Sequence, residues 1–250
     1  MLQLNNICKK FNKNSSDEKL IFENLNLHIK KGEFVVIVGG NGAGKSTLMN
    51  LISGSIFPDN GDIFIDGQNI TNLQENKRAK FIGRVFQDPL KGSAPNLTVE
   101  ENLSLALLRD KKRGLAFGVH KNKRALLKNG LKNFNLGLEN RLNAKMGLLS
   151  GGQRQAVTLL MATLVKPKIL LLDEHTAALD PKSSEKILEL TEKITSDEHI
   201  TTLMITHNLD DAIRLGNRLI MLNKGKIQFD VSGDDKRSLL NSNLSDMFKI

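Results

Sequence analysis

The chain has 250 residues, 40% of them hydrophobic and 25% charged, which suits a globular protein with one sizeable core, and its apolar runs are far shorter than the roughly 20 residues of a membrane-spanning helix. Cys8 is the only cysteine, which excludes an internal disulfide and a cysteine-ligated metal cluster, and the N-terminus lacks a signal-peptide pattern, so we expect a cytoplasmic protein. The net charge of +9 is compatible with nucleic acid, an anionic membrane surface or phosphorylated ligands, but Tyr and Trp are absent and the Phe residues are scattered, so we expect no nucleic-acid partner.

The N-terminal part of the sequence predicts an antiparallel sheet and one buried strand. Residues 1–30 alternate short apolar runs with polar turns, and Ile63-Phe64-Ile65 leads into Asp66-Gly67, a pair typical of a tight hairpin turn. Between them, the continuous apolar run Phe34–Val38 ends in glycines, which is typical of a strand buried on both faces. Residues 45–53 then predict a helix.

The remainder predicts a helical segment followed by alternating helices and strands. From about 89 to 149 the sequence is rich in lysine and helix-forming residues, and Thr98–Glu101 has the pattern of a capping box at a helix start. Amphipathic helices are expected after Gly152 and after Asp180, and a short helix with polar breaks from about 232. The expected strands lie at 169–172, 202–206 and 219–222. This alternation predicts a parallel sheet with right-handed crossovers.

A phosphate-binding loop is predicted at Gly39–Thr47, which matches G-x-x-x-x-G-K-[ST] between a predicted strand and a predicted helix. Its glycines let successive backbone N–H groups point at phosphate oxygens, and the following helix presents its positive end to the same anion. We expect Lys45 to reach the β- and γ-phosphates of ATP and the Ser46 hydroxyl to contact Mg²⁺. The full pattern disfavours the alternative, a glycine-rich turn without a ligand. The loop residues expected to bind nucleotide are Gly39, Asn41, Gly42, Ala43, Gly44, Lys45, Ser46 and Thr47.

Two carboxylates, Asp173 and Glu174, follow the apolar run at 169–172. In an open parallel sheet, this is the edge at which ligands bind. Alone, such a pair is more typical of a strand that ends in a solvated acidic turn. Together with the phosphate loop, it predicts that Asp173 holds Mg²⁺, directly or through water, and that Glu174 polarises the attacking water.

Four further segments occur in a fixed order around this pair. They are Val85-Phe86-Gln87, Leu149-Ser150-Gly151-Gly152-Gln153, Ala178-Leu179-Asp180 and Ile205-Thr206-His207. With the phosphate loop and the acid pair, they resemble the Q-loop, signature, D-loop and switch-histidine segments of ATP-binding cassette (ABC) ATPases over nearly the whole chain. The resemblance implies an α/β fold with a P-loop NTPase core: a mixed, mainly parallel sheet, an antiparallel β edge subdomain and an inserted helical subdomain.

Subdomain boundaries follow from the resemblance and the predicted elements. We expect a single nucleotide-binding domain over residues 1–250, with the RecA-like core and the antiparallel β subdomain at 1–88 and 150–230. The helical subdomain would span 89–149, and a C-terminal tail would span 231–250.

The resemblance also implies a head-to-tail homodimer with ATP between the phosphate loop of one copy and the signature of the other. Ser150, Gly151, Gly152 and Gln153 would then contact nucleotide in trans, and a helix N-terminus facing the γ-phosphate fits this role.

Three more polar residues acquire roles from the family pattern. Gln87 would bind Mg²⁺ and sense the permease, Asp180 would contact the nucleotide site across the dimer, and His207 would hydrogen-bond the γ-phosphate and orient Glu174. Taken singly, these three residues are more typical of a polar loop, a helix cap and a structural histidine. Together with Lys45 and Glu174, Gln87 and His207 are the expected catalytic residues.

The adenine in this family commonly stacks on an aromatic residue before the phosphate loop, and Phe11 is the candidate. A core position for Phe11 is the alternative, and Phe22 is its rival. His175 departs from the family pattern, in which proline commonly follows the catalytic glutamate, and this bears on the local backbone shape.

The segments 86–98 and 174–181 resemble a bacterial import subfamily. Its cassettes work with a separate permease related to branched-chain amino-acid carriers and with an extracytoplasmic substrate-binding lipoprotein, and some members carry aromatic amino acids. This implies a peripheral location on the inner face of the cell membrane. The basic residues between 111 and 128 predict a solvated helix face or, less favoured, a contact with anionic lipid.

Two other functions remain as alternatives. A soluble ABC ATPase of translation or DNA repair usually carries two cassettes or a long coiled coil, neither of which this sequence shows. A P-loop kinase would have no need of a signature that acts in trans.

Overall fold

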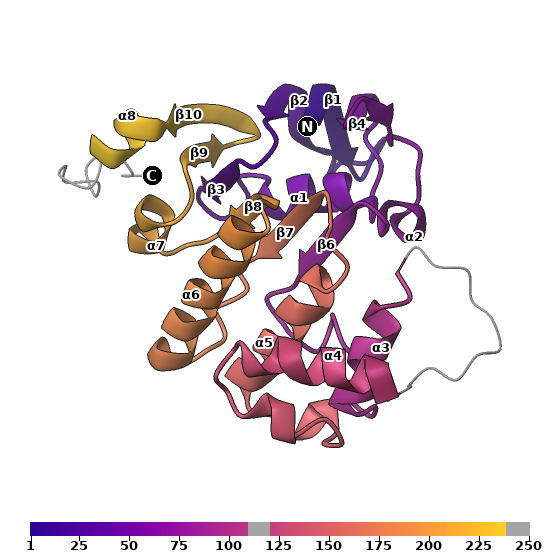
Figure 1. Cartoon of the computed structure of the whole chain (residues 1–250). Coiled ribbons are helices and arrows are strands. Elements are labelled where there is room, and N and C mark those ends of the chain that lie inside the picture. Colours follow the sequence, from indigo (N-terminus) through magenta and orange to yellow (C-terminus); the bar gives the residue numbers. More distant parts are fainter. Residues whose placement is uncertain (110–120, 239–250) are drawn as a thin grey trace. The chain divides into compact units, whose positions relative to one another are not determined.

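The computed structural model describes residues 1–109 and 121–238, which form two compact units (Figure 1). Of the described residues, unit 1 contains 1–81 and 199–238, and unit 2 contains 82–109 and 121–198. These units are regions in which the chain packs compactly, and they do not test subdomain boundaries. The boundaries expected after residues 88, 149 and 230 therefore stay predictions. Across the described ranges, no helix is long and apolar enough to cross a membrane.

Unit 1 contains two β-sheets. The antiparallel sheet has the strand order β2-β1-β4-β5, and in the other sheet β10 and β8 flank the pair β9-β3 in the order β10-β9-β3-β8. The strands are β1 (Leu2–Phe11), β2 (Lys19–Ile29), β3 (Phe34–Val38), β4 (Asn60–Ile65), β5 (Gln68–Asn69), β8 (Thr201–Ile205), β9 (Arg218–Asn223) and β10 (Lys226–Ser232). The helices are α1 (Lys45–Ser53), α2 (Glu75–Arg78), α7 (Leu209–Arg214) and α8 (Gly233–Ser238).

The antiparallel sheet follows from the alternation seen in the sequence. On β1, Leu2, Leu4 and Ile7 are fully buried, and Leu2 lies opposite Ile29 of β2. The turn between β4 and β5 places Asp66 at φ 49° and Gly67 at φ 76°. Both values lie in the left-handed region that two-residue hairpin turns of type I′ require, so the predicted sheet and hairpin are confirmed.

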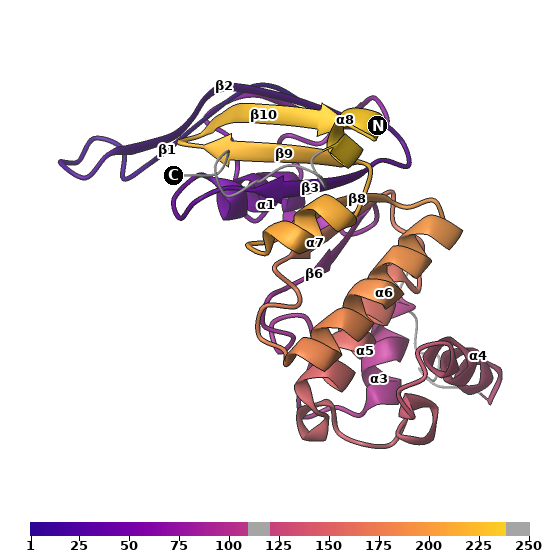
Figure 2. The ribbon, with the colours of Figure 1, turned by 90° about the vertical axis from the view of Figure 1, so that its left-hand side faces the viewer.

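The central strand of the other sheet is β3, whose five residues are all buried. It pairs in parallel with β8 and β9, as the continuous apolar run predicted. The antiparallel neighbour of β9, β10, was not predicted (Figure 2). Its alternation of Ile227, Phe229 and Val231 with polar residues is a strand signal that the sequence analysis did not use.

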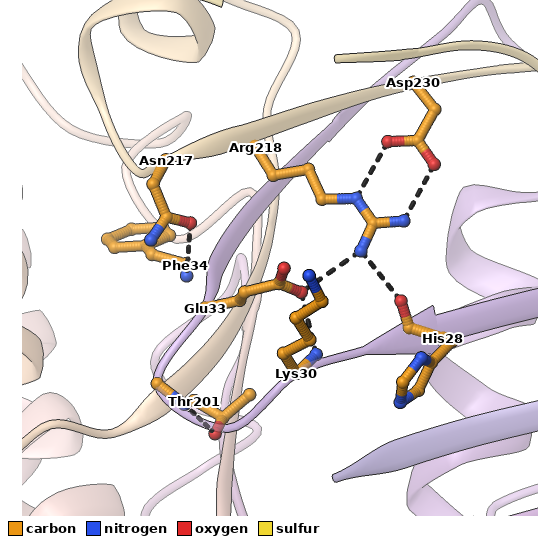
Figure 3. A network of polar contacts seen from close by, with 9 residues as sticks. His28, Lys30, Glu33, Phe34, Thr201, Asn217, Arg218 and Asp230 are labelled. Carbon is orange, nitrogen blue, oxygen red and sulfur yellow. Dashed lines mark hydrogen bonds and ion pairs between the residues drawn. The ribbon is translucent and has the colours of Figure 1, made fainter. Parts of the chain in front are cut away.

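A polar network at the start of β9 joins strands that are distant in sequence (Figure 3). The guanidinium of Arg218 donates two hydrogen bonds to Asp230, of 2.8 and 2.7 Å, and Nη1 donates to the carbonyl of His28 at 2.7 Å and to Glu33 at 3.1 Å. These carboxylates raise the pKa of Arg218. Strand ends from β2, β9 and β10 are thereby fixed together with the turn before β3.

Unit 2 is mainly helical. Its two strands, β6 and β7, pair in parallel, and α3, α4 and α6 each contact α5. The elements are β6 (Ile82–Val85), α3 (Val99–Ala106), α4 (Lys121–Lys132), the 3₁₀ turns η1 (Leu138–Asn140) and η2 (Met146–Leu148), α5 (Gly151–Thr163), β7 (Ile169–Asp173) and α6 (Pro181–Asp197).

The predicted helix starts in unit 2 are confirmed. Thr98 and Ser150 each form a complete capping box with the residue three positions on, and Asp180 caps α6 ahead of Pro181. The sequence analysis did not predict β6, because a glycine and Arg84 interrupt its apolar run. The basic stretch 111–113 lies outside the described residues.

Candidate nucleotide-binding site

The phosphate loop joins β3 to α1 in unit 1, with the helix at the bounds that the sequence predicted (Figure 1). Gly42 and Gly44 have φ values of 79° and 105°, in the left-handed region that favours glycine. Gly44 is the N-cap of α1, and no side chain caps the helix. The first N–H groups of α1 are therefore not satisfied by a side-chain cap, which fits the binding of a phosphate anion.

At two loop positions, neighbouring atoms leave no room for a side chain, so glycine is required. A Cβ atom at Gly39 would lie 2.2 Å from the carbonyl oxygen of Leu222, and one at Gly44 would lie 2.9 Å from the ring of Phe22. Neighbouring strands of unit 1 thus approach the loop so closely that a side chain at either glycine position would displace the loop.

Lys45 provides a positively charged side chain in this loop, and only 6% of its surface is exposed. Its ammonium donates hydrogen bonds to the carbonyl oxygens of Gly39, at 2.7 Å, and Gly40, at 3.1 Å. Ser46 is exposed at the start of α1, and Thr47 is partly exposed. The loop therefore holds one buried positive charge at a helix N-terminus, a donor set that fits a polyphosphate.

A residue that the sequence analysis missed supports the loop from the β9–β10 turn. The N–H of Gly225 donates to the carbonyl oxygen of Ala43 at 3.1 Å. Gly225 has φ 76°, and a Cβ atom there would lie 1.7 Å from the carbonyl oxygen of Ile21. The preceding Lys224 also has positive φ, at 47°. The Lys-Gly pair between two strand runs was the available signal for this turn.

The two aromatic candidates for adenine differ in exposure. Phe22 is fully buried, and its ring packs against Gly44, so it belongs to the core. Phe11 ends β1 with 37% of its surface exposed, and the Lys9 ammonium lies 5.5 Å from its ring centroid. Of the two, Phe11 is the exposed residue, and its contact with adenine stays a prediction.

His207 is exposed in unit 1, between β8 and α7. The residue after it, Asn208, caps α7 by accepting from the N–H of Asp211 at 3.1 Å. The histidine thus precedes a well-defined helix start, and its role as a γ-phosphate contact stays a prediction.

The acid pair lies at the end of β7 in unit 2. Both carboxylates are partly exposed, and Glu174 has φ 47°. A left-handed conformation is uncommon for a glutamate and is often found at functional positions. Glu174 also accepts the N–H of Ala177 at its backbone oxygen, at 3.0 Å, so the strained residue opens a turn.

His175, which departs from the family pattern, is only 1% exposed. Its Nε2 lies 3.1 Å from the Thr191 hydroxyl of α6, and this hydroxyl already donates to the carbonyl of Ile187 at 2.8 Å. The Nε2 atom of His175 must therefore carry the proton. Burial lowers the pKa of this histidine to about 4, so it is neutral at physiological pH.

Arg84 is a second residue that the sequence analysis missed. Its Nη2 lies 2.9 Å from Oδ2 of Asp173, on the neighbouring strand. An arginine inside a strand that is otherwise apolar was the available signal, because such a charge needs a partner.

The signature segment forms the N-terminus of α5. Ser150 and Gly151 are exposed, whereas Gly152 is buried, and a Cβ atom at Gly152 would lie 2.9 Å from Cβ and Oγ of Ser183. Gln153 Oε1 accepts from Arg141 Nη1 at 3.0 Å. Packing against α6 thus fixes one signature glycine and leaves the serine and the other glycine accessible.

Gln87 and Asp180 are both exposed in unit 2. Gln87 follows β6, and Asp180 Oδ1 accepts the N–H of Ser183 at 3.0 Å. Hydrogen bonds from the hydroxyl of Ser183 and then from its backbone N–H lower the pKa of Asp180. The cap confirms the local role expected for Asp180, and the roles of both residues toward nucleotide stay predictions.

Oxygen donors of the kind that Mg²⁺ prefers are present on the predicted metal residues. The Ser46 hydroxyl, the Gln87 amide oxygen and the Asp173 carboxylate are such donors, and Mg²⁺ commonly takes one or two carboxylates plus substrate phosphates. These residues fit the ion chemically.

Comparison with known proteins identifies this arrangement. Residues 22–177 match the family model described as "ABC transporter". The chain belongs to the ABC transporter ATPases. It is 48% identical over 249 residues to the tyrosine transport ATP-binding protein of Clostridioides difficile strain R20291, covering 100% of this chain and 99% of the relative. It is 38% identical to an uncharacterized ABC transporter ATP-binding protein of Methanocaldococcus jannaschii, MJ0796, over 91% of this chain and 95% of that protein.

Solved ABC cassettes share the fold. The dimeric post-hydrolysis structure of MJ0796 bound to ADP and Pi has a TM-score of 0.78 and 36% identity, covering 93% of this chain and 98% of the other. A nucleotide-free cassette has a TM-score of 0.80 and 26% identity, covering 100% of this chain and 98% of the other. These likenesses confirm the predicted P-loop cassette fold with its mixed sheet and antiparallel sheet.

As an ABC ATPase, the protein binds and hydrolyses ATP and is the ATP-binding subunit of a transporter. ABC ATPase domains pair with transmembrane permeases and dimerise, as in the MJ0796 dimer.

Proposed function

We propose that this ABC ATPase energises the import of an amino acid, of the aromatic class, through a separate permease. The observation that carries the proposal is the 48% identity to a tyrosine transport ATP-binding protein over the whole length of both chains. The subfamily resemblance of segments 86–98 and 174–181 supports the direction of transport. The translation and DNA-repair alternative has no support of this kind.

We propose the following roles for the residues around the nucleotide. The main chain of the phosphate loop and Lys45 hold the phosphates, and Phe11 stacks on the adenine. Glu174 polarises the attacking water, and His207 hydrogen-bonds the γ-phosphate and orients Glu174. The loop geometry and the buried Lys45 support the binding of the phosphates, and the strained backbone of Glu174 supports its role toward the attacking water.

Asp173, Ser46 and Gln87 are proposed to hold Mg²⁺. When bound, the ion neutralises charge on the β- and γ-phosphate oxygens. Asp173 supplies the carboxylate, Ser46 the hydroxyl and Gln87 an amide oxygen that can also report contact with the permease.

The proposed assembly contains two copies of the chain, the permease and, indirectly, an extracytoplasmic lipoprotein that captures the substrate. The exposed Ser150 and Gly151 of one copy, with Gly152, Gln153 and Asp180, complete the nucleotide site of the other. This arrangement would place the protein on the inner face of the membrane.

The permease is proposed to contact the segment 87–101, where Leu90 is 40% exposed beside the exposed Gln87. The test is affinity purification of the tagged chain from detergent-solubilised membranes, with mass spectrometry of the proteins that accompany it. We expect a polytopic permease, lost on Leu90→Asp and kept in the matched control Leu148→Asp, whose leucine is 72% exposed in the same unit. Recovery of ribosomes or repair factors in place of a permease would reject the transport proposal.

Substrate and direction need a reconstituted transporter. Proteoliposomes that contain the recovered permease, with the cassette and ATP on one side, should move labelled tyrosine toward that side when the binding lipoprotein is added opposite. Glu174→Gln should abolish this movement and trap an ATP-bound dimer in sedimentation. A monomeric Glu174→Gln variant at saturating ATP would contradict the shared nucleotide site.

A further inference from the structure

Arg84 forms an ion pair with the carboxylate that is proposed to hold Mg²⁺. The Nη2–Oδ2 distance to Asp173 is 2.9 Å, and the two side chains are only 12% and 17% exposed. In the parallel pair of β6 and β7, Arg84 lies opposite Leu171, two residues before Asp173. Strand register therefore brings the guanidinium to the end of β7.

The guanidinium of Arg84 also contacts an aromatic ring. Its Cζ lies 4.6 Å from the ring centroid of Phe86. The carbonyl of Phe86 accepts a hydrogen bond from Nε2 of Gln155 at 3.2 Å, and Gln155 is fully buried in α5. The backbone of Phe86 is thus held in place, and the contact with its ring restricts the guanidinium, so Arg84 has less freedom to lose on binding Asp173.

A fixed cation next to a carboxylate weakens the binding of a second cation to that carboxylate. The effect is strong where solvent screens little, as at this partly buried pair. Nucleotide phosphates would reverse the balance, because they add negative charge and further oxygen ligands for the metal.

We propose that Arg84 is a positioning residue that holds Asp173 and suppresses the binding of a divalent cation there until nucleotide is present. The inference rests on the proposed role of Asp173 in holding Mg²⁺. It makes metal binding conditional on nucleotide, through a contact between two side chains of neighbouring strands.

The test is titration of the full chain with Mn²⁺, a paramagnetic substitute for Mg²⁺, with free Mn²⁺ read by electron paramagnetic resonance. Without nucleotide, Arg84→Met should bind Mn²⁺ at least about tenfold more tightly than the wild type. Arg84→Lys, which keeps the charge, should stay within about threefold of the wild type. The matched control is Arg124→Met, since Arg124 also pairs with a carboxylate of unit 2, Glu100, at 3.0 Å. We expect it to leave Mn²⁺ binding unchanged.

Saturating ADP should shrink the difference between Arg84→Met and the wild type. Equal or weaker Mn²⁺ binding by nucleotide-free Arg84→Met would overturn the inference. If circular dichroism shows that Arg84→Met does not fold, Arg84→Gln carries the same expectation.

Asp173→Asn separates this inference from the proposed function. With ADP, Mn²⁺ binding that is unaffected by Asp173→Asn would reject Asp173 as a metal residue. Weakened binding in Asp173→Asn, together with no effect of Arg84→Met, would reject the role of Arg84 alone.

Discussion

The backbone N–H of Gly225 donates a hydrogen bond to the carbonyl oxygen of Ala43, at 3.1 Å. This bond ties the turn between β9 and β10 to the middle of the phosphate loop. Both partners belong to unit 1 but are separated by most of the chain. The shape of the loop therefore depends on a turn that carries none of the motif's own residues.

Gly225→Ala should destabilise the protein and weaken nucleotide binding. The added Cβ would lie 1.7 Å from the carbonyl oxygen of Ile21, so the turn must move away from Ala43. We expect a loss of about 3 kcal/mol or more in the free energy of unfolding, measured by denaturant titration.

The matched control for Gly225 is Gly67→Ala. Gly67 has the same φ of 76°, but nothing lies within 4 Å of a Cβ atom there. It should lose only about 1 kcal/mol, from backbone strain, and keep full nucleotide affinity by calorimetry. Equal losses in the two variants would show that strain, and not the contact with Ile21, governs Gly225.

Arg218→Lys should lower stability by about 1–3 kcal/mol, because an ammonium cannot reproduce the two parallel bonds to Asp230 and the bonds to Glu33 and His28 (Figure 3). Chemical denaturation measures the effect. Arg214→Lys is the control, since Arg214 lies 3.7 Å from Asp211 and is 45% exposed. Its loss should stay below about 0.5 kcal/mol, and a similar loss in both variants would contradict the importance of the network.

His175 should make the protein less stable in acid. Its folded pKa is lowered by burial to about 4, from 6.5, so between these values the unfolded chain binds more protons and stability falls as the pH falls. Below pH 4 the free energy of unfolding should be lower by about 3 kcal/mol in total. Above pH 6.5 this histidine should have no effect on it.

His175→Gln should remove this part of the pH dependence, measured by denaturant unfolding of nucleotide-free protein in chelating buffer from pH 7 to 4. The exposed His28 provides the control, and His28→Gln should keep the wild-type slope. If His175→Gln also keeps that slope, the histidine is not buried in its neutral form.

Gly152→Ala should destabilise the protein, although alanine usually favours a helix, because its Cβ would lie 2.9 Å from Ser183. Ser183→Gly should recover part of the loss, with a coupling energy above about 1 kcal/mol in a double-mutant cycle. The control is Gly130→Ala in α4, where the nearest atom, of Leu160, is at an ordinary 3.5 Å. It should not lower the melting temperature. Additive effects of Gly152→Ala and Ser183→Gly would reject the close contact.

The sequence by itself determined the local parts of this ABC ATPase. Spacing and residue type suffice to predict features that depend on residues within a few positions of each other. Such features are the bounds of α1, the caps at Thr98, Ser150 and Asp180, and the hairpin at Asp66-Gly67. The family could be predicted from the order of such local motifs.

The tertiary structure decided the contacts that depend on strand register. Three such contacts join segments that are separate in the sequence. They are the pairing of Arg84 with Asp173, the support of Ala43 by Gly225 and the burial of Phe22 beside Gly44. No local pattern specifies such a pair, because a shift of one residue in a strand turns each of its side chains to the opposite face of the sheet. The sequence therefore offered signals for Arg84 and Gly225 themselves, whereas their partners were determined only by the tertiary structure.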